Sequence, residues 1–286
     1  MRSKVSALSA LYFLLGVCVG IVLLEGYQRV RWSQAEAKSV HDDVIDSRIE
    51  IPVKAVRSNR MMVALTFGQA GSSNAGETPK KANGKVFNFY NGKIYLAEDP
   101  LLGASGDGGS VWTRLGDQLI ERALYDTVIF APIGVGGSAI ANWQPGSDLH
   151  DKLLQTIRKI QQSGLTITHL LWHQGESDAL RHTDKEEYQT MFRTMLANIR
   201  NEGVTAPIYV AISSSARCKK IKSDSAIRQA QEQLVDNSNG IFSGPDTDIL
   251  GLADRFDGCH FSDQGLEKMS TLWFEALTDM KRPPQF

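Results

Sequence analysis

The stretch that decides the fold is MMVALTFGQAGSSNAGE, residues 61–77. Residues 61–67 form a continuous apolar run, which is typical of a β-strand buried on both faces of a sheet. The run stops at Gly68, and a polar, glycine-rich turn with two adjacent serines, Ser72 and Ser73, follows it. Such a turn is a usual setting for a nucleophile at the end of a strand. The stretch therefore predicts a buried strand and, at its end, a candidate catalytic serine.

The segments that follow alternate between the same two kinds of pattern. Apolar runs predict three more buried strands, at residues 127–133, 166–172 and 207–212. Amphipathic periodicity predicts helices at residues 110–124, 149–160, 183–199, 227–235 and 266–277, the third of them opened by a capping box of Thr183 and Glu186. This order predicts an α/β fold, a three-layer α/β/α sandwich with a mostly parallel, flavodoxin-like central sheet.

The composition bounds the size of the fold and excludes one class of partner. The chain has 286 residues, of which 42% are hydrophobic and 22% are charged, and its formal net charge is -1. This is enough for one large domain with a full hydrophobic core. Because the net charge is close to zero, the chain has no electrostatic footprint for nucleic acid, and we expect no nucleic acid partner.

The N-terminal region differs in character from the rest. Residues 7–24 are apolar and uncharged, and as a helix they would be about 27 Å long, close to the hydrocarbon thickness of a bilayer. No small-x-small site follows directly, which favours an uncleaved signal anchor over a cleaved signal peptide. The positive charges of Arg2 and Lys4 favour an N-inside orientation with the domain outside the cytoplasm, in a periplasm or extracellular space. The expected organisation is a short tail, a transmembrane anchor, a juxtamembrane stalk and one membrane-anchored domain, at residues 1–6, 7–24, 25–59 and 60–286.

Polar segments follow the first three predicted strands, at residues 68–77, 134–143 and 173–179. Because the carboxyl ends of parallel strands meet at one edge of a sheet, we expect these segments to form one site. A hydrolase site needs a nucleophile, a base, a group that orients the base and donors for the oxyanion. Asp257 precedes His260 by three residues on a loop, so its carboxylate can orient the imidazole. This pair is the candidate acid and base.

Two further segments offer donors for an oxyanion. Glycines just before the helix at 110–124 have free backbone N–H groups, and Gly109 is the candidate because Ser110 is the expected N-cap. Gln174 follows the strand at 166–172 and adds a neutral side-chain donor.

Five motifs in this order resemble the SGNH (GDSL-like) hydrolases, in particular the branch of sialate O-acetylesterases and acetylxylan-type carbohydrate esterases. The motifs are FGQ…SNAGE, DPLLGASGDGGSVWTRLG, PIGVGGSAIANWQPG, LWHQGESDA and DGCHFSDQG, and the resemblance covers residues 61–277. It implies a serine esterase that removes O-acetyl groups from carbohydrates, with no metal or cofactor. It also implies that Asp257 and His260 belong to a Ser-His-Asp triad and that Gly109 and Gln174 complete the oxyanion hole.

The resemblance implies roles for the residues around this machinery as well. Gln69 belongs to the first motif at the end of the first strand. Gly137 and Ser138 would line the acyl or sugar side of the cleft. Glu176 and Asp178 would hold the loop that carries Gln174.

The nucleophile is the point where the chain departs from the family pattern. The family motif is G-Q-S-N-A, and here Ala70 follows Gly68 and Gln69. If the motif is shifted by three residues, Ser73 is the nucleophile, with Ser72 as the alternative. On a helical turn, positions 70 and 73 share a face. The ungapped reading leaves Ala70 at the nucleophile position and predicts an inactive glycan-binding relative. A glycan O-acetyltransferase is a third reading, because the motifs do not separate transfer to a sugar from transfer to water.

The chain has three cysteines, and one of them, Cys18, lies in the predicted anchor. Cys218 and Cys259 remain for the domain, and in an exported domain two such thiols can form a disulfide. The alternative is that both are unpaired small side chains, and the sequence does not decide between the two.

Overall fold

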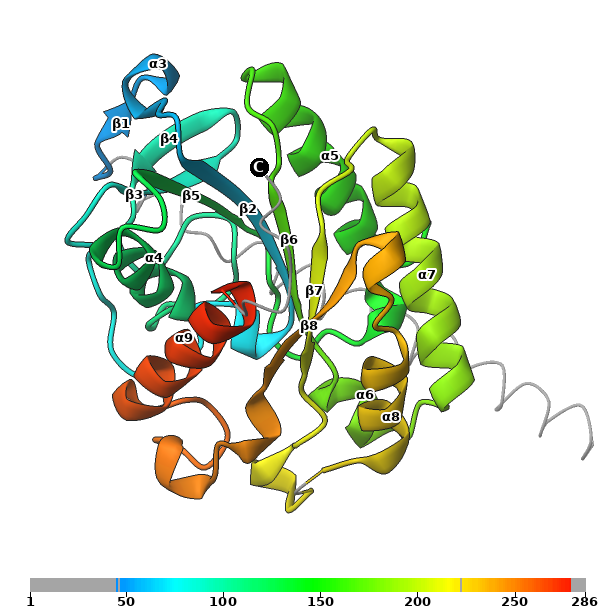
Figure 1. Ribbon diagram of the computed structural model, residues 1–286. Helices are drawn as coiled ribbons and strands as arrows, with labels where there is room; N and C mark the ends of the chain where they lie inside the picture. The colour runs from blue at the N-terminus through cyan, green and yellow to red at the C-terminus, as the bar shows by residue number, and fades with distance from the viewer. Residues whose placement is uncertain (1–44, 46, 222, 279–286) are drawn as a thin grey trace, which may run out of the picture.

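The apolar run forms the strand β2 (Met61–Gly68), in which every residue after the first is buried. In the computed structural model, which describes residues 45, 47–221 and 223–278, β2 lies inside an eight-stranded sheet of order β1-β4-β3-β5-β2-β6-β7-β8 (Figure 1). It pairs in parallel with β5 (Thr127–Pro132) on one side and with β6 (His169–His173) on the other. A strand with neighbours on both sides and helices over both faces has no solvent-facing side, which explains why its sequence is apolar at almost every position.

The other strands extend the sheet in both directions. β7 (Ile208–Ile212) and β8 (Ile241–Asp246) continue it in parallel beyond β6. On the other side β3 (Val86–Tyr90) is parallel to β5, and β4 (Lys93–Leu96) and β1 (Glu50–Ile51) add antiparallel strands at the edge. Strands β2, β5, β6, β7 and β8, numbered 1 to 5 along the chain, lie in the order 2-1-3-4-5. This is the flavodoxin-like order, so the predicted fold class is confirmed.

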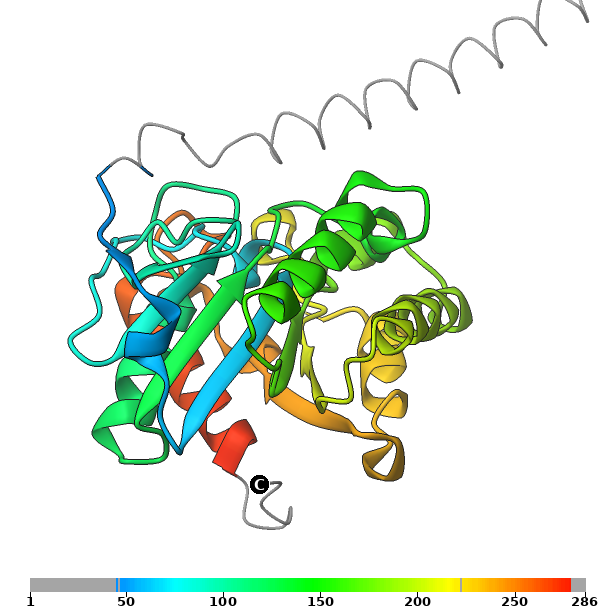
Figure 2. The same cartoon turned by 90° about the horizontal axis from the view of Figure 1, so that it is seen from above.

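Helices cover both faces, as the view from above in Figure 2 shows. On one face, α4 (Val111–Glu121) packs against α9 (Asp263–Thr278), with the rings of Trp112 and Trp273 5.3 Å apart. On the other face, the core packs around Phe67 and Trp172, whose ring centroids are 5.0 Å apart. The helices of this second face are α5 (Asp148–Gln162), α7 (Lys185–Asn201) and α8 (Ser225–Gln233). The short elements are α3 (Val53–Val56), α6 (Glu176–Arg181), η1 (Ala70–Ser72), η2 (Ile140–Trp143), η3 (Arg217–Lys219), η4 (Asn237–Asn239), η5 (Thr247–Ile249) and η6 (Leu252–Asp254).

The N-terminal boundary of the domain lies earlier than predicted. The strand β1 and the helix α3 fall inside the predicted stalk at residues 25–59, yet Ile51 pairs with Ile94 and Val56 is only 2% exposed. The apolar contacts of these residues make them part of the domain, so the predicted start at residue 60 is wrong. The predicted anchor at residues 7–24 lies outside the described residues and stays a prediction. Within the described part of the chain, no helix has the length and apolar character needed to cross a bilayer.

The loops at the carboxyl ends of the parallel strands meet at one edge of the sheet. The backbone N–H of Gln69, just after β2, donates to the carbonyl of His173 at the end of β6, at 2.9 Å. The N–H of Val135, after β5, donates to the carbonyl of Gly68 at 2.9 Å. The three predicted polar segments therefore come together, as expected for a sheet of this topology.

Candidate active site

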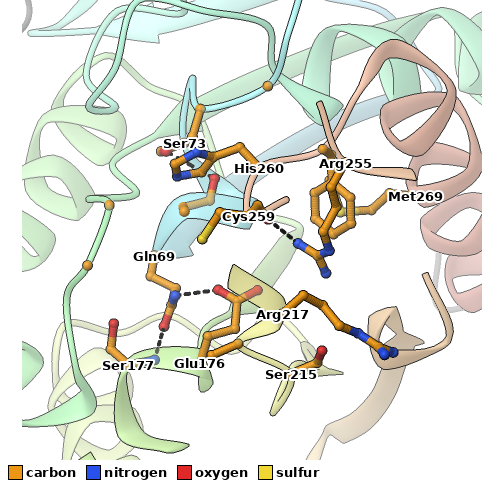
Figure 3. A pocket seen from close by; sticks show the side chains of 18 of the residues that line it. Gln69, Ser73, Glu176, Ser177, Ser215, Arg217, Arg255, Cys259, His260 and Met269 are labelled. Carbon is orange, nitrogen blue, oxygen red and sulfur yellow. Dashed lines mark hydrogen bonds between the residues drawn. The ribbon is translucent and has the colours of Figure 1, made fainter. Parts of the chain in front are cut away.

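A cavity of about 320 Å³ lies at this edge of the sheet. Its wall is built from the η1 turn, the loop after β5, the start of α6, the loop after β7 and the loop before α9. Figure 3 shows Ser73 and His260 at one end of the cavity and Glu176, Ser177 and Ser215 at the other. Segments that are far apart in the sequence thus supply one shared wall.

Of the two adjacent serines, only Ser73 lines the cavity. Its hydroxyl donates to the carbonyl of Ala70 at 3.0 Å, across the η1 turn. Ser72 is fully buried and points away, because it packs against Gly134, and its hydroxyl has no hydrogen bond in the described structure. Ala70 also lines the cavity, at the first position after Gln69. The geometry thus favours Ser73 over Ser72 as the nucleophile and leaves Ala70 at the strand-end position.

The η1 turn can form only because glycine occupies its middle position. A Cβ atom on Gly71 would lie 2.3 Å from Cε1 of His173, whose ring is fully buried beneath the turn. Burial, together with the positive charge of Arg255, lowers the pKa of His173 to about 3. This histidine is therefore a neutral packing platform for the turn.

His260 and Asp257 form the predicted pair on the loop before α9. Nδ1 of His260 lies 2.7 Å from Oδ2 of Asp257, while Oδ1 accepts the backbone N–H groups of Cys259 (2.8 Å) and His260 (2.6 Å). Burial on its own would raise the pKa of Asp257, but the hydrogen bonds from His260 and Cys259 outweigh it, so this pKa lies below its usual value. An ionised Asp257 holds the Nδ1–H tautomer, which leaves Nε2 of His260 as a proton acceptor.

Ser73 and His260 line the same cavity but are not hydrogen-bonded to each other in the described structure. Rotation of the Ser73 hydroxyl away from the Ala70 carbonyl is the simplest movement that would turn it toward the base. Catalytic hydrogen bonds are often incomplete before a substrate binds. Ser73 and the His260–Asp257 pair thus lie at one cavity, without a hydrogen bond between Ser73 and His260 in the described structure.

The two predicted oxyanion donors do not reach the cavity. The N–H of Gly109 is used by the carbonyl of Gly76, at 2.9 Å, in an isolated β-bridge. Gln174 is fully buried, and its amide donates to the carbonyl of Ser138 at 3.1 Å and to Oδ2 of Asp178 at 2.5 Å. The predicted roles of Gly109 and Gln174 are therefore not supported, because both donors are already used to hold loops together.

Other N–H groups face the cavity instead. Ala70, Gly71 and Gly137 line it, and their backbone N–H groups make no hydrogen bond to any residue that the structure describes. Ala70 and Gly71 open the η1 turn, where N–H groups lack an intrahelical partner. A family motif does not reveal these donors, since backbone groups carry no sequence signal of their own.

Two residues with implied roles near the cleft serve to tie loops together. Ser138 is 5% exposed and does not line the cavity; its hydroxyl donates to the carbonyl of Val135 at 2.9 Å. Asp178 accepts the N–H of Ile140 at 2.9 Å and the amide of Gln174. Burial raises the pKa of Asp178 despite these hydrogen bonds. Asp178 thus holds the loop of Gln174, in agreement with the implied role.

Gln69 and Glu176 form a second connection across the edge of the sheet, and both line the cavity. The Gln69 side-chain oxygen accepts the N–H groups of Gly175 (3.2 Å) and Ser177 (3.0 Å), and its amide nitrogen donates to Oε2 of Glu176. Burial raises the pKa of Glu176 to about 7; Arg255 and His260 oppose this rise. Glu176 is therefore a cavity-facing carboxyl that titrates near neutral pH.

Two arginines at the cavity were not predicted. Arg255 lies 4.3 Å above the ring of Phe261 and donates to the carbonyl of Cys259, and Arg217 donates to the carbonyl of Asp248 at 2.6 Å. In the described structure, neither guanidinium lies within 4.0 Å of a carboxylate oxygen. Isolated basic residues in loops have no pattern that sequence reasoning could use. They give the cavity donors that no carboxylate of a described residue neutralises by direct contact.

Cys259, between Asp257 and His260, also lines the cavity and is disulfide-bonded. The side chain of Cys218 is outside the described part of the structure, so the predicted Cys218–Cys259 pairing stays a prediction. Among the described residues, no three His, Cys, Asp or Glu side chains gather as a metal site would require.

Comparison with known proteins identifies the family of the chain. The model of a family described as carbohydrate esterase, sialic acid-specific acetylesterase, matches residues 69–279. The "Probable carbohydrate esterase At4g34215" of Arabidopsis thaliana is 34% identical over 71 residues, which are 25% of this chain and only 27% of that relative's length.

Solved structures agree in fold. The X-ray structure of the At4g34215 protein superimposes with a TM-score of 0.61 at 19% identity, covering 76% of this chain and 96% of that chain. A family 3 carbohydrate esterase of Clostridium thermocellum superimposes with a TM-score of 0.52 at 13% identity, covering 77% of this chain and 97% of that chain. The family match covers most of the chain and includes every candidate site residue named above. The chain therefore belongs to the family of sialic acid-specific acetylesterases, which are carbohydrate esterases.

Proposed function

We propose that the protein is a serine esterase that removes O-acetyl groups from carbohydrates, with Ser73 as nucleophile, His260 as base and Asp257 as the residue that orients the base. One observation carries this proposal: Ser73 and His260 line one cavity, and Nδ1 of His260 lies 2.7 Å from Asp257. Membership of a carbohydrate esterase family supports hydrolysis of an ester. The choice of Ser73 is the part that needs a direct test.

The proposed reaction is an acyl transfer in two steps. Ser73 Oγ attacks the acetyl carbonyl while Nε2 of His260 takes the hydroxyl proton, and Asp257 stabilises the imidazolium. The oxyanion is held by free backbone N–H groups among Ala70, Gly71 and Gly137. His260 then protonates the departing sugar oxygen, and water hydrolyses the acetyl-enzyme by the same sequence.

The far end of the cavity favours a sugar over a lipid as the group that carries the ester. Its lining includes Glu176, Ser177, Ser215, Arg217 and Arg255, all of which offer polar atoms. The two arginines make no carboxylate ion pair in the described structure, which favours a sugar with a carboxylate of its own. The family description, sialic acid-specific, is consistent with such an acidic sugar.

A second candidate function is glycan binding without turnover. The observation in its favour is that Ala70, not serine, occupies the cavity-facing position directly after Gln69. If the position of Ala70 is the true nucleophile position, the cavity retains a sugar site and lacks the reacting atom.

The deciding experiment is covalent labelling of the nucleophile. We expect a fluorophosphonate to react with the wild-type protein and mass spectrometry to locate the adduct on Ser73, with the adduct lost in His260→Ala. Hydrolysis of an acetyl ester that persists in His260→Ala would remove the triad assignment. Absence of both adduct and hydrolysis, with retained sugar binding, would support the second candidate.

The membrane anchor at residues 7–24 and the location of the domain outside the cytoplasm are a separate proposal. It rests on the uncharged apolar stretch and on the positive charges before it. Resistance of the full chain to alkaline carbonate extraction, together with protease access to the domain only from outside, is the expected result. Release of the full chain by carbonate would contradict the anchor.

A further inference from the structure

Glu176 lies at the start of α6, at the end of the cavity opposite His260 (Figure 3). The triad mechanism does not use Glu176. Burying a carboxyl, even in part, costs free energy unless the group has a hydrogen-bond partner. One of its two oxygens has such a partner inside the protein, which is Gln69. The role of the other oxygen, Oε1, depends on which groups face it.

The hydrogen bonds of Gln69 decide which Glu176 oxygen is free. The Gln69 oxygen accepts three N–H groups, from Gly175, Ser177 and the side chain of Gln174 at 3.3 Å. Turning the amide over would place its NH₂ against three donors, so its nitrogen must face Glu176. Oε2 of Glu176 is therefore an acceptor in either protonation state. Oε1 is left, either as a second acceptor or as the atom that carries the proton.

The surroundings of the carboxyl leave Oε1 for a ligand. No hydrogen bond within 3.5 Å joins Oε1 to a residue that the structure describes. Burial, the largest influence, and Asp248 favour the neutral form of the carboxyl. Arg255, His260 and the nearby Ser213 hydroxyl, which is buried with no hydrogen-bond partner within 3.5 Å in the described structure, favour the charged form. Since these influences nearly balance, both forms are present at neutral pH. A sugar hydroxyl can donate to one form and accept from the other.

We propose that Glu176 is a substrate-binding residue whose Oε1 hydrogen-bonds a free hydroxyl of the sugar that carries the acetyl ester, and that this contact selects sugar esters over simple acetyl esters. The inference rests on the proposed esterase function. It follows from the position of the carboxyl, which lies in the same cavity as Ser73 and His260 but at the opposite end. A sugar ring whose acetyl group is at Ser73 would present its other hydroxyls to this wall.

Two variants and two kinds of substrate test the contact. Glu176→Ala removes both oxygens, whereas Glu176→Gln keeps an oxygen that accepts from Gln69 and changes only the cavity-facing atom to NH₂. The substrates are an O-acetylated sialic acid or acetylated xylo-oligosaccharide, which have hydroxyls, and p-nitrophenyl acetate, which has none. Loss of a hydrogen bond from a carboxyl to a substrate hydroxyl is expected to lower kcat/KM for the sugar ester by about 10- to 100-fold in Glu176→Ala, with a smaller fall in Glu176→Gln.

The aryl ester separates binding from a purely structural role. We expect Glu176→Ala to lower kcat/KM for the sugar ester at least about tenfold more than for p-nitrophenyl acetate, because the aryl ester has no hydroxyl for Oε1 to bind. An equal fall on both substrates in Glu176→Ala would mean that Glu176 only supports Gln69 and the η1 turn, which overturns the inference. Unchanged kinetics on the sugar ester would also overturn it.

Failure of the proposed function has a different signature. It would appear as a wild-type protein that hydrolyses neither substrate and takes no label at Ser73. Calorimetric binding of the deacetylated sugar then decides the inference by itself. We expect Glu176→Ala to raise the Kd by about 10-fold or more, and an unchanged Kd refutes the contact.

Discussion

Substitution of Asp257 by asparagine tests the part of the site that the geometry defines best. The change keeps the size of the side chain and removes the negative charge beside His260. The charge acts on the imidazolium that forms in the transition state, so the loss should appear in kcat. At the observed 2.7 Å between Nδ1 and Oδ2, the charge interaction is worth about 1.5 kcal/mol in water and about 6 kcal/mol at an effective dielectric constant of about 20.

Solvent exposure decides where in this range the effect falls. Both side chains, His260 and Asp257, are 38% exposed, so the interaction is screened and lies in the lower half of the range. We expect a loss of about 2–3 kcal/mol of transition-state stabilisation, which is a fall in kcat of about 30- to 150-fold. The assay is the hydrolysis of p-nitrophenyl acetate at saturating substrate, with the melting temperature as a check on folding.

The matched control is Asp107→Asn, which removes the same charge from an exposed loop position. It should leave kcat unchanged within about twofold, since the change lies on the exposed surface. A fall of less than about threefold in Asp257→Asn, with a normal melting temperature, would refute the view that Asp257 stabilises the His260 imidazolium. A fall of equal size in Asp107→Asn would show that the loss reflects the general field of the protein.

Three further predictions concern the surroundings of the site. Burial raises the pKa of Glu176 to about 7 in the folded protein, so the folded state holds this proton more tightly than the unfolded chain, and the stability that it contributes is lost as the pH rises from about 4.5 to about 7. Glu176→Gln should therefore raise the free energy of unfolding by about 1–3 kcal/mol at pH 8 and leave it unchanged at pH 4.5, as measured by urea unfolding. Gly71→Ala should lower the free energy of unfolding by about 1–3 kcal/mol and abolish most activity, because its Cβ would lie 2.3 Å from the His173 ring. The control is Gly251→Ala, whose added Cβ has no atom within 4 Å, and it should leave both the stability and the rate unchanged. Reduction of the disulfide at Cys259 should lower kcat by about threefold or more, since small displacements of catalytic groups slow the reaction. The rate of Cys259→Ser should not change with the reductant, and equal rates with and without reductant in the wild type would contradict this prediction.

The central strands were predictable because their physics is local. Residues 61–67 are apolar apart from Thr66, and a strand that is covered on both faces favours such a near-continuous apolar run. The strands farther from the centre of the sheet have a weaker sequence signal. β3 contains the buried Asn88, whose side chain accepts the N–H of Leu102 at 2.6 Å, and β8 contains Gly244 and Pro245. Residues of these types are depleted in strands, so pattern reading passed over both segments.

The start of α7 shows how a local rule can choose the wrong neighbour. The predicted capping box used Thr183, but the N-cap is Asp184, whose carboxylate accepts the N–H of Glu186 at 2.9 Å. The Thr183 hydroxyl donates instead to Asp178 at 2.8 Å. Two good capping residues stand side by side, and a tertiary contact decides between them.

In the candidate site, too, local features were predictable from the sequence and contacts between distant residues were not. The spacing of Asp257 and His260 is local, and the structure places the two side chains in contact as predicted. The availability of a donor is not local, because Gly109 and Gln174 are used by partners that are distant in the sequence. Arg255 and Arg217 reach the cavity only through the packing of two loops. The sequence thus predicts which loops meet at the edge of the sheet and which residues are the candidate base pair. The fold is needed to tell hydrogen-bond donors that are free from those that already have a partner.

The identity of the nucleophile is the central claim, and a pair of serine variants tests it most directly. Ser73 lines the cavity with His260, whereas Ser72 is buried with a hydroxyl that has no hydrogen bond in the described structure. We expect Ser73→Ala to lower kcat/KM for an acetyl ester by about 10³-fold or more. Ser72→Ala should stay within about threefold, as it removes no hydrogen bond. Near wild-type hydrolysis by Ser73→Ala, in a protein with an unchanged melting temperature, would contradict the account.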